Sequence, residues 1–222
     1  DNYAGIKERT DFVGVLTCLG GPSKSLDIKK TKQSWLGSPE SIDRLLESVS
    51  AASDLLLRDF TPLNGSDERQ FSSPAFELPT IQFSRTVYGQ YPEYHTNQDD
   101  LAFMNIGQVE DSAHKIVNIL SLYEASKWVP RPIVGGGEPF LSKRGLYPGI
   151  NTPDSHYGAN RESFDSGIPF SLDDLLLVLS VTDGRRSLLE IAEALNRNPA
   201  LVRDIVKFLE QSGILEQSEN NS

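Results

Sequence analysis

Only one cysteine, Cys18, occurs in the 222 residues of this chain. A single cysteine cannot form an internal disulfide, and a chain without disulfides suits a reducing compartment such as the cytoplasm. Cys18 lies in a nearly continuous apolar run at 12–19, FVGVLTCL. This setting favours a small buried hydrophobic side chain over a reactive nucleophile. We therefore expect a cytoplasmic protein in which this thiol has no catalytic role.

Long apolar runs and positive charge are also scarce. No stretch of roughly 18 apolar residues could cross a bilayer, and the first residues, DNYAGIKERT, do not resemble a signal peptide. They lack an initiator methionine, so we expect a fragment or a processed chain. The formal net charge of -10 at pH 7 repels nucleic acids and anionic membranes. These absences predict a soluble protein that has neither nucleic acid nor a membrane as its default partner.

The apolar residues that are present form runs typical of an α/β protein, and the chain is long enough to bury a core. Strands are predicted at 12–19, 25–34, 55–60 and 78–85. The second of them carries several lysines and is expected to be an exposed edge strand. One helix is predicted to begin with Ser38 as its cap and Pro39 at its first position, and a longer one covers 107–127. This order of elements fits an α/β sandwich.

The last fifty residues carry the signals of a second domain. Helices are predicted to begin at Ser171, at Ser187 through a capping-box pattern, and at Pro199. Gly213 then breaks the chain before a short apolar strand. Three short helices followed by a strand are the outline of a winged-helix domain.

The charges of this tail do not favour DNA. Acidic residues outnumber basic ones in 171–222, and the third helix offers only Arg203 and Lys207 to a phosphate backbone. We therefore expect the winged helix to bind a protein partner or a second copy of the chain. Residues 128–170, rich in Pro, Gly, Ser and Asn, are predicted to form a connector that packs on the first domain.

The stretch 91–101, YPEYHTNQDDL, is the first candidate for chemistry. It places His95 among Glu93, Asp99 and Asp100, just after a predicted strand. A neutral imidazole binds metal through one nitrogen while a carboxylate orients the other. A zinc site needs three or four ligands, however, and one histidine supplies one. Spacing alone therefore favours an ordinary histidine on a surface loop.

Three motifs in this order, GSDERQF at 65–71, RTVYGQYPEYHTNQDDL at 85–101 and EPFLSKRGLYP at 138–148, resemble a bacterial family. Its members are aminopeptidase-like proteins that end in a winged helix. They are similar in fold to zinc aminopeptidases, a group that includes glutamate carboxypeptidase and the transferrin-receptor ectodomain. The resemblance implies a three-layer α/β/α zinc-aminopeptidase-like domain, incomplete here, at 1–127. The connector at 128–170 and a winged-helix domain at 171–222 would follow.

The resemblance also implies a metal site. It makes His95 a zinc ligand, Asp99 a residue that supports it, and Asp1 a second ligand through the segment DNYAG. Thr17 stands where such enzymes have an aspartate that binds a second metal, so we expect one zinc ion. The paired glutamates of the family would fall between Ile6 and Lys7, and this sequence does not contain them.

Catalysis would then need a base from the visible residues. Glu93 and Glu68 are the candidates, and Asp67, Arg69, Arg85 and Tyr94 are candidates for substrate contacts. The alternative is that Glu68 and Arg69 form a surface ion pair, that Glu93 is solvated, and that the others serve packing.

Three functions compete at this point. The first is a zinc-dependent hydrolase of a peptide or aminoacyl amide, which predicts stoichiometric zinc in the intact protein. The second is a catalytically inactive aminopeptidase fold used as a binding or assembly module, which Thr17 and the missing glutamates favour. The third is a DNA-binding regulator, which the acidic tail opposes.

Overall fold

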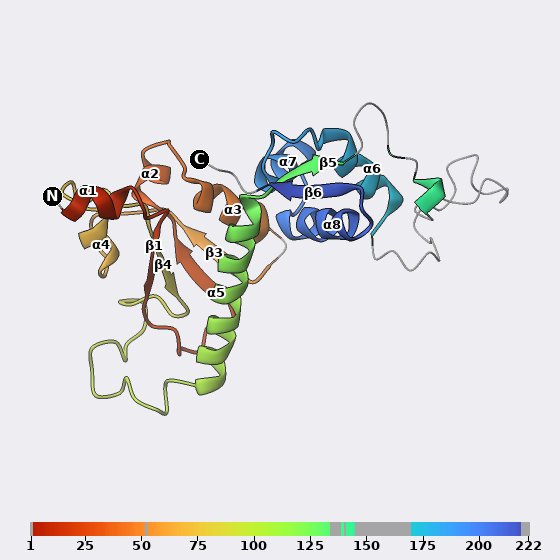
Figure 1. Ribbon diagram of the computed structural model, residues 1–222. Helices are drawn as coiled ribbons and strands as arrows, with labels where there is room; N and C mark the ends of the chain where they lie inside the picture. The colour runs from red at the N-terminus through yellow and green to blue at the C-terminus, as the bar shows by residue number, and fades with distance from the viewer. Residues whose placement is uncertain (1, 52, 134–138, 140, 145–169, 219–222) are drawn as a thin grey trace. The chain divides into compact units, whose positions relative to one another are not determined.

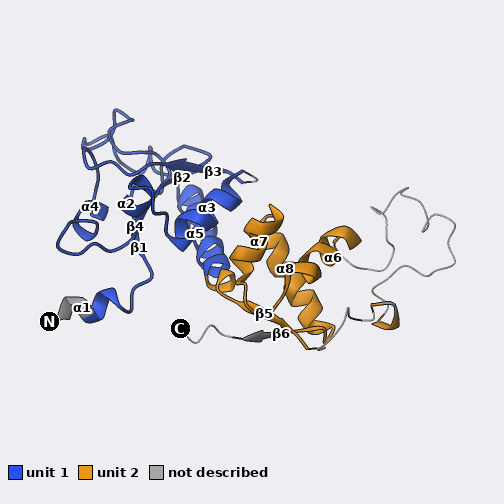
Figure 2. Cartoon of the chain, turned by 90° about the horizontal axis from the view of Figure 1, so that it is seen from above, with its two compact units in different colours: residues 1–123 blue, residues 124–222 orange. Residues whose placement is uncertain are grey.

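The computed structural model describes residues 2–51, 53–133, 139, 141–144 and 170–218 (Figure 1). The chain divides into two compact units, an N-terminal unit at 1–123 and a C-terminal unit at 124–222 (Figure 2). Among the helices of the described ranges, none is both long and apolar enough to cross a membrane.

A mixed four-stranded sheet forms the centre of the N-terminal unit. Its strands lie in the order β1 (Val13–Leu16), β4 (Thr80–Ser84), β2 (Leu26–Lys29) and β3 (Leu55–Arg58). β1 runs parallel to β4, and β2 runs antiparallel to β4 and parallel to β3. All four strands fall inside the runs that the sequence predicted.

The expectation of an exposed edge strand at 25–34 is wrong. β2 lies inside the sheet between β4 and β3, and all four of its residues are buried. Lysine in a strand suggests solvent because burying an unpaired ammonium is costly. Lys29 is nevertheless fully buried, since another part of the chain supplies its counter-charge.

The two faces of this sheet differ in chemistry. Residues that face each other across β2 and β4 point to the same side, so Ile28 and Phe83 share the apolar face. Lys29 and Gln82 share the opposite, polar face. Helix α3 (Ser41–Ser50) adds a buried apolar stripe to the unit's core. The short helix α4 (Glu68–Phe71) brings Glu68 to the polar face, where it meets Lys29.

The cap of helix α3 lies two residues later than the predicted cap at Ser38. Its N-cap is Glu40, and the Asp43 carboxylate accepts the Glu40 N–H at 2.9 Å. The same carboxylate accepts the Thr31 N–H at 2.9 Å and the Thr31 hydroxyl at 2.6 Å. The buried Asp43 carboxylate binds both the helix cap and Thr31, and it therefore fixes the residue at which α3 begins. The unit also contains α1 (Asn2–Lys7), α2 (Lys32–Trp35) and most of α5 (Ile106–Ser126).

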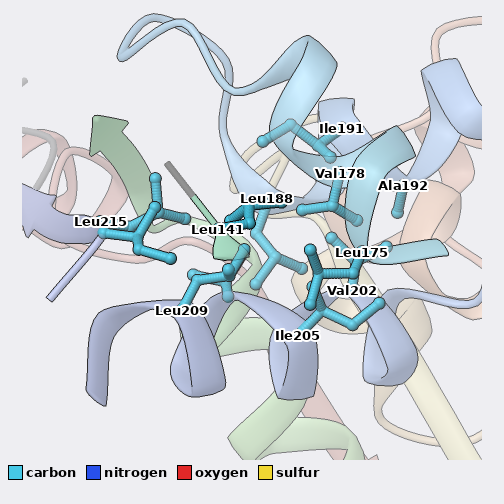
Figure 3. Packing of buried hydrophobic residues seen from close by; sticks show 12 residues of the cluster. Leu141, Leu175, Val178, Leu188, Ile191, Ala192, Val202, Ile205, Leu209 and Leu215 are labelled. Atoms are coloured by element: carbon cyan, nitrogen blue, oxygen red, sulfur yellow. The ribbon is translucent and has the colours of Figure 1, made fainter. Parts of the chain in front are cut away.

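The C-terminal unit is a winged-helix domain. It consists of β5 (Val129–Pro132), a 3-10 turn (Ser142–Arg144), α6 (Leu172–Val181), α7 (Leu188–Leu195), α8 (Pro199–Gln211) and β6 (Leu215–Ser218). β5 and β6 pair in antiparallel fashion. The three helices and β6 enclose an apolar core of twelve buried residues (Figure 3).

Local sequence signals set these helix starts. Ser171, Ser187 and Asn198 accept backbone N–H groups of the first turns of α6, α7 and α8. The described part of the predicted connector differs from expectation, because β5 pairs with β6 and Leu141 lies in the core of this unit. Residues 145–169 of that connector lie outside the described residues.

Candidate functional site

The segment 85–105, here called the histidine loop, leaves the sheet where β4 ends. β1 and β4 are parallel, so both end at the same edge of the sheet. The backbone N–H groups of Arg85 and Thr86 donate to the Cys18 carbonyl just after β1, and the Asn105 N–H donates to the Gly20 carbonyl. Both ends of the loop are therefore tied to the segment that follows β1.

A close approach of backbones at this point requires glycine. A Cβ atom added to Gly21 would lie 2.0 Å from the Thr86 hydroxyl oxygen. No side chain fits at that distance without displacing Thr86. The Gly20-Gly21 pair therefore lets the segment after β1 lie against the start of the histidine loop.

Several aromatic rings of the histidine loop contact one another, and one of them stacks on His95. The rings of Tyr94 and His95 stack with centroids 4.0 Å apart and planes at 16°. Tyr88 and Tyr91 lie 6.0 Å and 5.6 Å from Tyr94, and Tyr91 stacks on Phe103 at 4.9 Å. We call these five residues the aromatic cluster. His95 is exposed and has a left-handed backbone with φ of 59°.

The Cys18 thiol borders the aromatic cluster. Cys18 is partly exposed rather than buried, has φ of 50°, and lies 3.5 Å from the Tyr91 hydroxyl, which donates to it. Burial raises the pKa of Tyr91, as do its bond to Cys18 and the nearby charge of Asp99. Burial also raises the pKa of Tyr94, with further contributions from Cys18, Tyr88 and Asp99. These phenols therefore stay protonated at neutral pH and can donate hydrogen bonds.

Glu68 lies in a buried ion pair on the polar face of the sheet. Its Oε1 is 2.7 Å from Lys29 Nζ, and the side chains are 1% and 0% exposed. The other oxygen, Oε2, accepts the Ser66 N–H at 2.9 Å and the Gln82 amide at 3.2 Å. This pair differs from the surface pair with Arg69 that the sequence suggested, because Arg69 is exposed while Glu68 is buried.

Arg85 is buried as well, at 2% exposure. Its guanidinium donates to Ser112 Oγ at 2.9 Å and to the Ser23 carbonyl at 2.7 Å. It also donates to the side chains of Gln108 and Asp111 at the start of α5. All three guanidinium nitrogens of Arg85 thus donate to protein acceptors. These bonds tie Arg85 to α5 and to the segment after β1.

The remaining predicted residues fall into three places. Asp67 and Arg69 are exposed at α4, Glu93 is half-buried in the histidine loop, and Asp99 is exposed there. Asp1 lies outside the described residues, so its pairing with His95 stays a prediction. Tyr94, His95, Glu93 and Asp99 thus all lie in the histidine loop, and Tyr94 and His95 are in ring contact there.

A metal site can be tested on the donors that are present. In 2–51, 53–133, 139, 141–144 and 170–218, no three side chains of histidine, cysteine, aspartate or glutamate gather around one point. Three protein ligands are the minimum for a catalytic zinc site. The described residues by themselves therefore do not fit a complete zinc site.

Sequence reasoning missed Lys29, which the structure connects to the histidine loop through Tyr88. Lys29 Nζ donates to the Tyr88 hydroxyl at 3.1 Å and lies 5.7 Å from the centre of its ring. Asp27 and Lys29 are two residues apart in the strand sequence LDIK and so lie on the same face of the sheet. This spacing is the one signal in the sequence that could have indicated a buried polar face.

Comparisons with known proteins agree with this division of the chain. A family model described as Domain of unknown function (DUF4910) matches residues 5–126, and a winged helix-turn-helix model matches 128–217. A relative from Clostridium acetobutylicum is 34% identical over 180 residues, which are 80% of this chain and 37% of the relative. It is named as a candidate polysaccharide biosynthesis protein with an aminopeptidase-like domain.

A solved structure is also similar. The crystal structure of a candidate peptidase from Clostridium acetobutylicum superposes with a TM-score of 0.72 at 25% identity. The match covers 97% of this chain and 44% of the other. The chain thus spans less than half the length of both relatives.

Proposed function

The chain belongs to the family defined by the Domain of unknown function (DUF4910), and on this basis we propose that it forms part of an aminopeptidase-like hydrolase. Its substrate would be a peptide or an aminoacyl amide. Two relatives support this assignment, one with an aminopeptidase-like domain and one a candidate peptidase. The observation that carries the proposal is the exposed His95, stacked on Tyr94 at the edge where β1 and β4 end.

We further propose a single zinc ion bound through His95, with Asp1 as a second ligand and Asp99 orienting the site. The described residues supply only part of such a ligand set, so the remainder would come from outside them. Of the two predicted bases, Glu93 is the better placed, because it is half-buried in the histidine loop. A general base must reach the substrate, and Glu68 is enclosed and paired with Lys29.

Metal analysis and a substrate panel test this proposal together. The purified full chain is expected to bind one zinc ion and to hydrolyse aminoacyl amides in a zinc-dependent way. The substitution His95→Ala should abolish both properties. His114→Ala is the matched control, because His114 is an exposed histidine on α5. Zinc retained at the parent level in His95→Ala would refute the ligand assignment.

A second candidate is an inactive aminopeptidase fold that serves binding or assembly. Thr17 at the end of β1 and the enclosed Glu68 favour it, because neither can act as the expected carboxylate. Zinc binding through His95 without turnover across the substrate panel would support this candidate.

The winged-helix domain would provide the assembly surface in either case. We propose a protein partner or a second copy of the chain, since acidic residues outnumber basic ones in 171–222. Light scattering measures the oligomeric state, and duplex DNA binding that weakens steeply with salt would instead support a nucleic-acid role. A cytoplasmic location remains part of the proposal.

A further inference from the structure

Lys29 connects the interior of the sheet to the histidine loop. Its ammonium has three N–H donors, and the structure gives it three acceptors. These are Glu68 Oε1 at 2.7 Å, the Asn64 carbonyl at 3.2 Å and the Tyr88 hydroxyl at 3.1 Å. The side chain is fully buried on β2. Its ammonium therefore has a fixed position that a solvent-exposed lysine would lack.

Glu68 is fixed in turn. Besides Lys29, its carboxylate accepts the Ser66 N–H and the Gln82 side-chain amide. Gln82 belongs to β4, and β2 carries Lys29, so both strands hold the pair. Moving Lys29 or Glu68 would leave a desolvated charge unpaired, so these two side chains hold each other in place.

From Tyr88 the contacts continue outward through aromatic rings. Tyr88 lies 6.0 Å from Tyr94 with planes at 39°, and Tyr94 stacks on His95 at 4.0 Å. His95 itself is exposed and has a left-handed backbone, a conformation that persists only where its surroundings hold it. The hydrogen bond from Lys29 to the Tyr88 hydroxyl therefore connects the buried ion pair of the sheet to the rings of Tyr88, Tyr94 and His95.

We propose that Lys29 and Tyr88 are positioning residues that set the orientation of the His95 imidazole, with Glu68 holding Lys29 in place. Neither residue needs to touch a substrate for this role. The importance of this role rests on the proposed hydrolase, in which His95 is the zinc ligand. The orientation of the imidazole ring can be measured whether or not the chain is a hydrolase.

Histidine NMR of the zinc-free full chain tests this inference without relying on activity. The chain has only three histidines, and His95→Gln identifies the signals of His95. A tyrosine ring stacked at 4.0 Å shifts the imidazole protons upfield through its ring current. Tyr94→Leu removes that ring and gives the shift expected for an unstacked His95.

Tyr88→Phe is the decisive variant, because it keeps the aromatic ring and removes only the hydroxyl that Lys29 holds. We expect its His95 signals to move toward those of Tyr94→Leu, while the His114 signals stay unchanged. Lys29→Met should cause the same displacement. Arg69→Ala, a change at an exposed neighbour of Glu68, is the matched control and should leave His95 at its parent position.

The outcomes separate this inference from the proposed function. His95 signals that stay at the parent position in folded Tyr88→Phe would overturn the positioning role. Displaced His95 signals support it even where the parent chain shows no hydrolysis, and in that case only the proposed function fails. An equal displacement of the His114 signals would indicate a general loosening of the fold and would also overturn the inference.

Discussion

Replacing Glu68 by glutamine should destabilise the N-terminal unit strongly. The glutamine has a similar shape, but it leaves the Lys29 ammonium buried at 0% exposure without a counter-charge. Removing one partner of a buried ion pair costs about 3–5 kcal/mol. A domain of this kind unfolds with a free energy of roughly 5–15 kcal/mol, so the change removes a large part of the stability.

Urea unfolding followed by tryptophan fluorescence measures this effect. The chain has two tryptophans. Trp35 belongs to the N-terminal unit and lies 6.0 Å from Phe60, and Trp128 belongs to the other unit. In a Trp128→Phe background the fluorescence therefore reports the N-terminal unit alone. With an m-value of about 2 kcal/mol/M, the urea midpoint of Glu68→Gln should fall by roughly 2 M.

Two further variants decide whether the ion pair is the cause. Lys29→Met combined with Glu68→Gln should cost less than the sum of the two single changes, because no unpaired charge remains buried. Arg69→Ala should stay within about 0.5 kcal/mol of the parent, since Arg69 is exposed. A Glu68→Gln midpoint no lower than that of Arg69→Ala would refute the reasoning.

Two other predictions concern Asp27 and Ser187. Burial raises the pKa of Asp27, although Arg58 and Ser84 lower it. The contribution of Asp27 to the unfolding free energy is therefore complete below the ordinary pKa of aspartate, and it is lost as pH rises through the folded-state pKa. The unfolding free energy of the parent minus that of Asp27→Asn should therefore decrease from about pH 4 upward, and a difference that grows with pH would contradict this. Ser187→Ala removes the acceptor for the Glu190 N–H and should lower the stability of the C-terminal unit by about 1 kcal/mol, as Trp128 fluorescence in a Trp35→Phe background would show. An unchanged midpoint would mean that the cap adds nothing.

The winged-helix unit was predictable because its signals are local. Ser187 meets its partner Glu190 three residues later, and Pro199 starts α8 at its first position. Such contacts depend on backbone geometry within one turn, so the sequence shows them directly. The sequence also located the four strands of the N-terminal unit, since each lies inside a predicted run that is two to six residues longer. β5 was missed, because two of its four residues are prolines.

The candidate site was predictable only in part. The motif around His95 indicated the loop, and the structure places Tyr94 and His95 in direct contact there. The zinc ion, Asp1 and the catalytic roles stay predictions. Glu68 was predicted as a base and Arg85 as a substrate contact, whereas their burial and their protein partners became visible only in the fold.

The sequence by itself located the longer helices and the strands β1 to β4, because periodicity and capping act over a few residues, but it did not indicate β5 or the short helices α1, α2 and α4. Only the tertiary structure decided that β2 lies inside the sheet and that Lys29 is buried. The reason is physical. A lysine in a strand indicates solvent exposure unless a carboxylate offsets the loss of hydration, and here that carboxylate, Glu68, lies 39 positions further along the chain. No local pattern records that pairing, and the link from Lys29 through Tyr88 toward His95 depends on it.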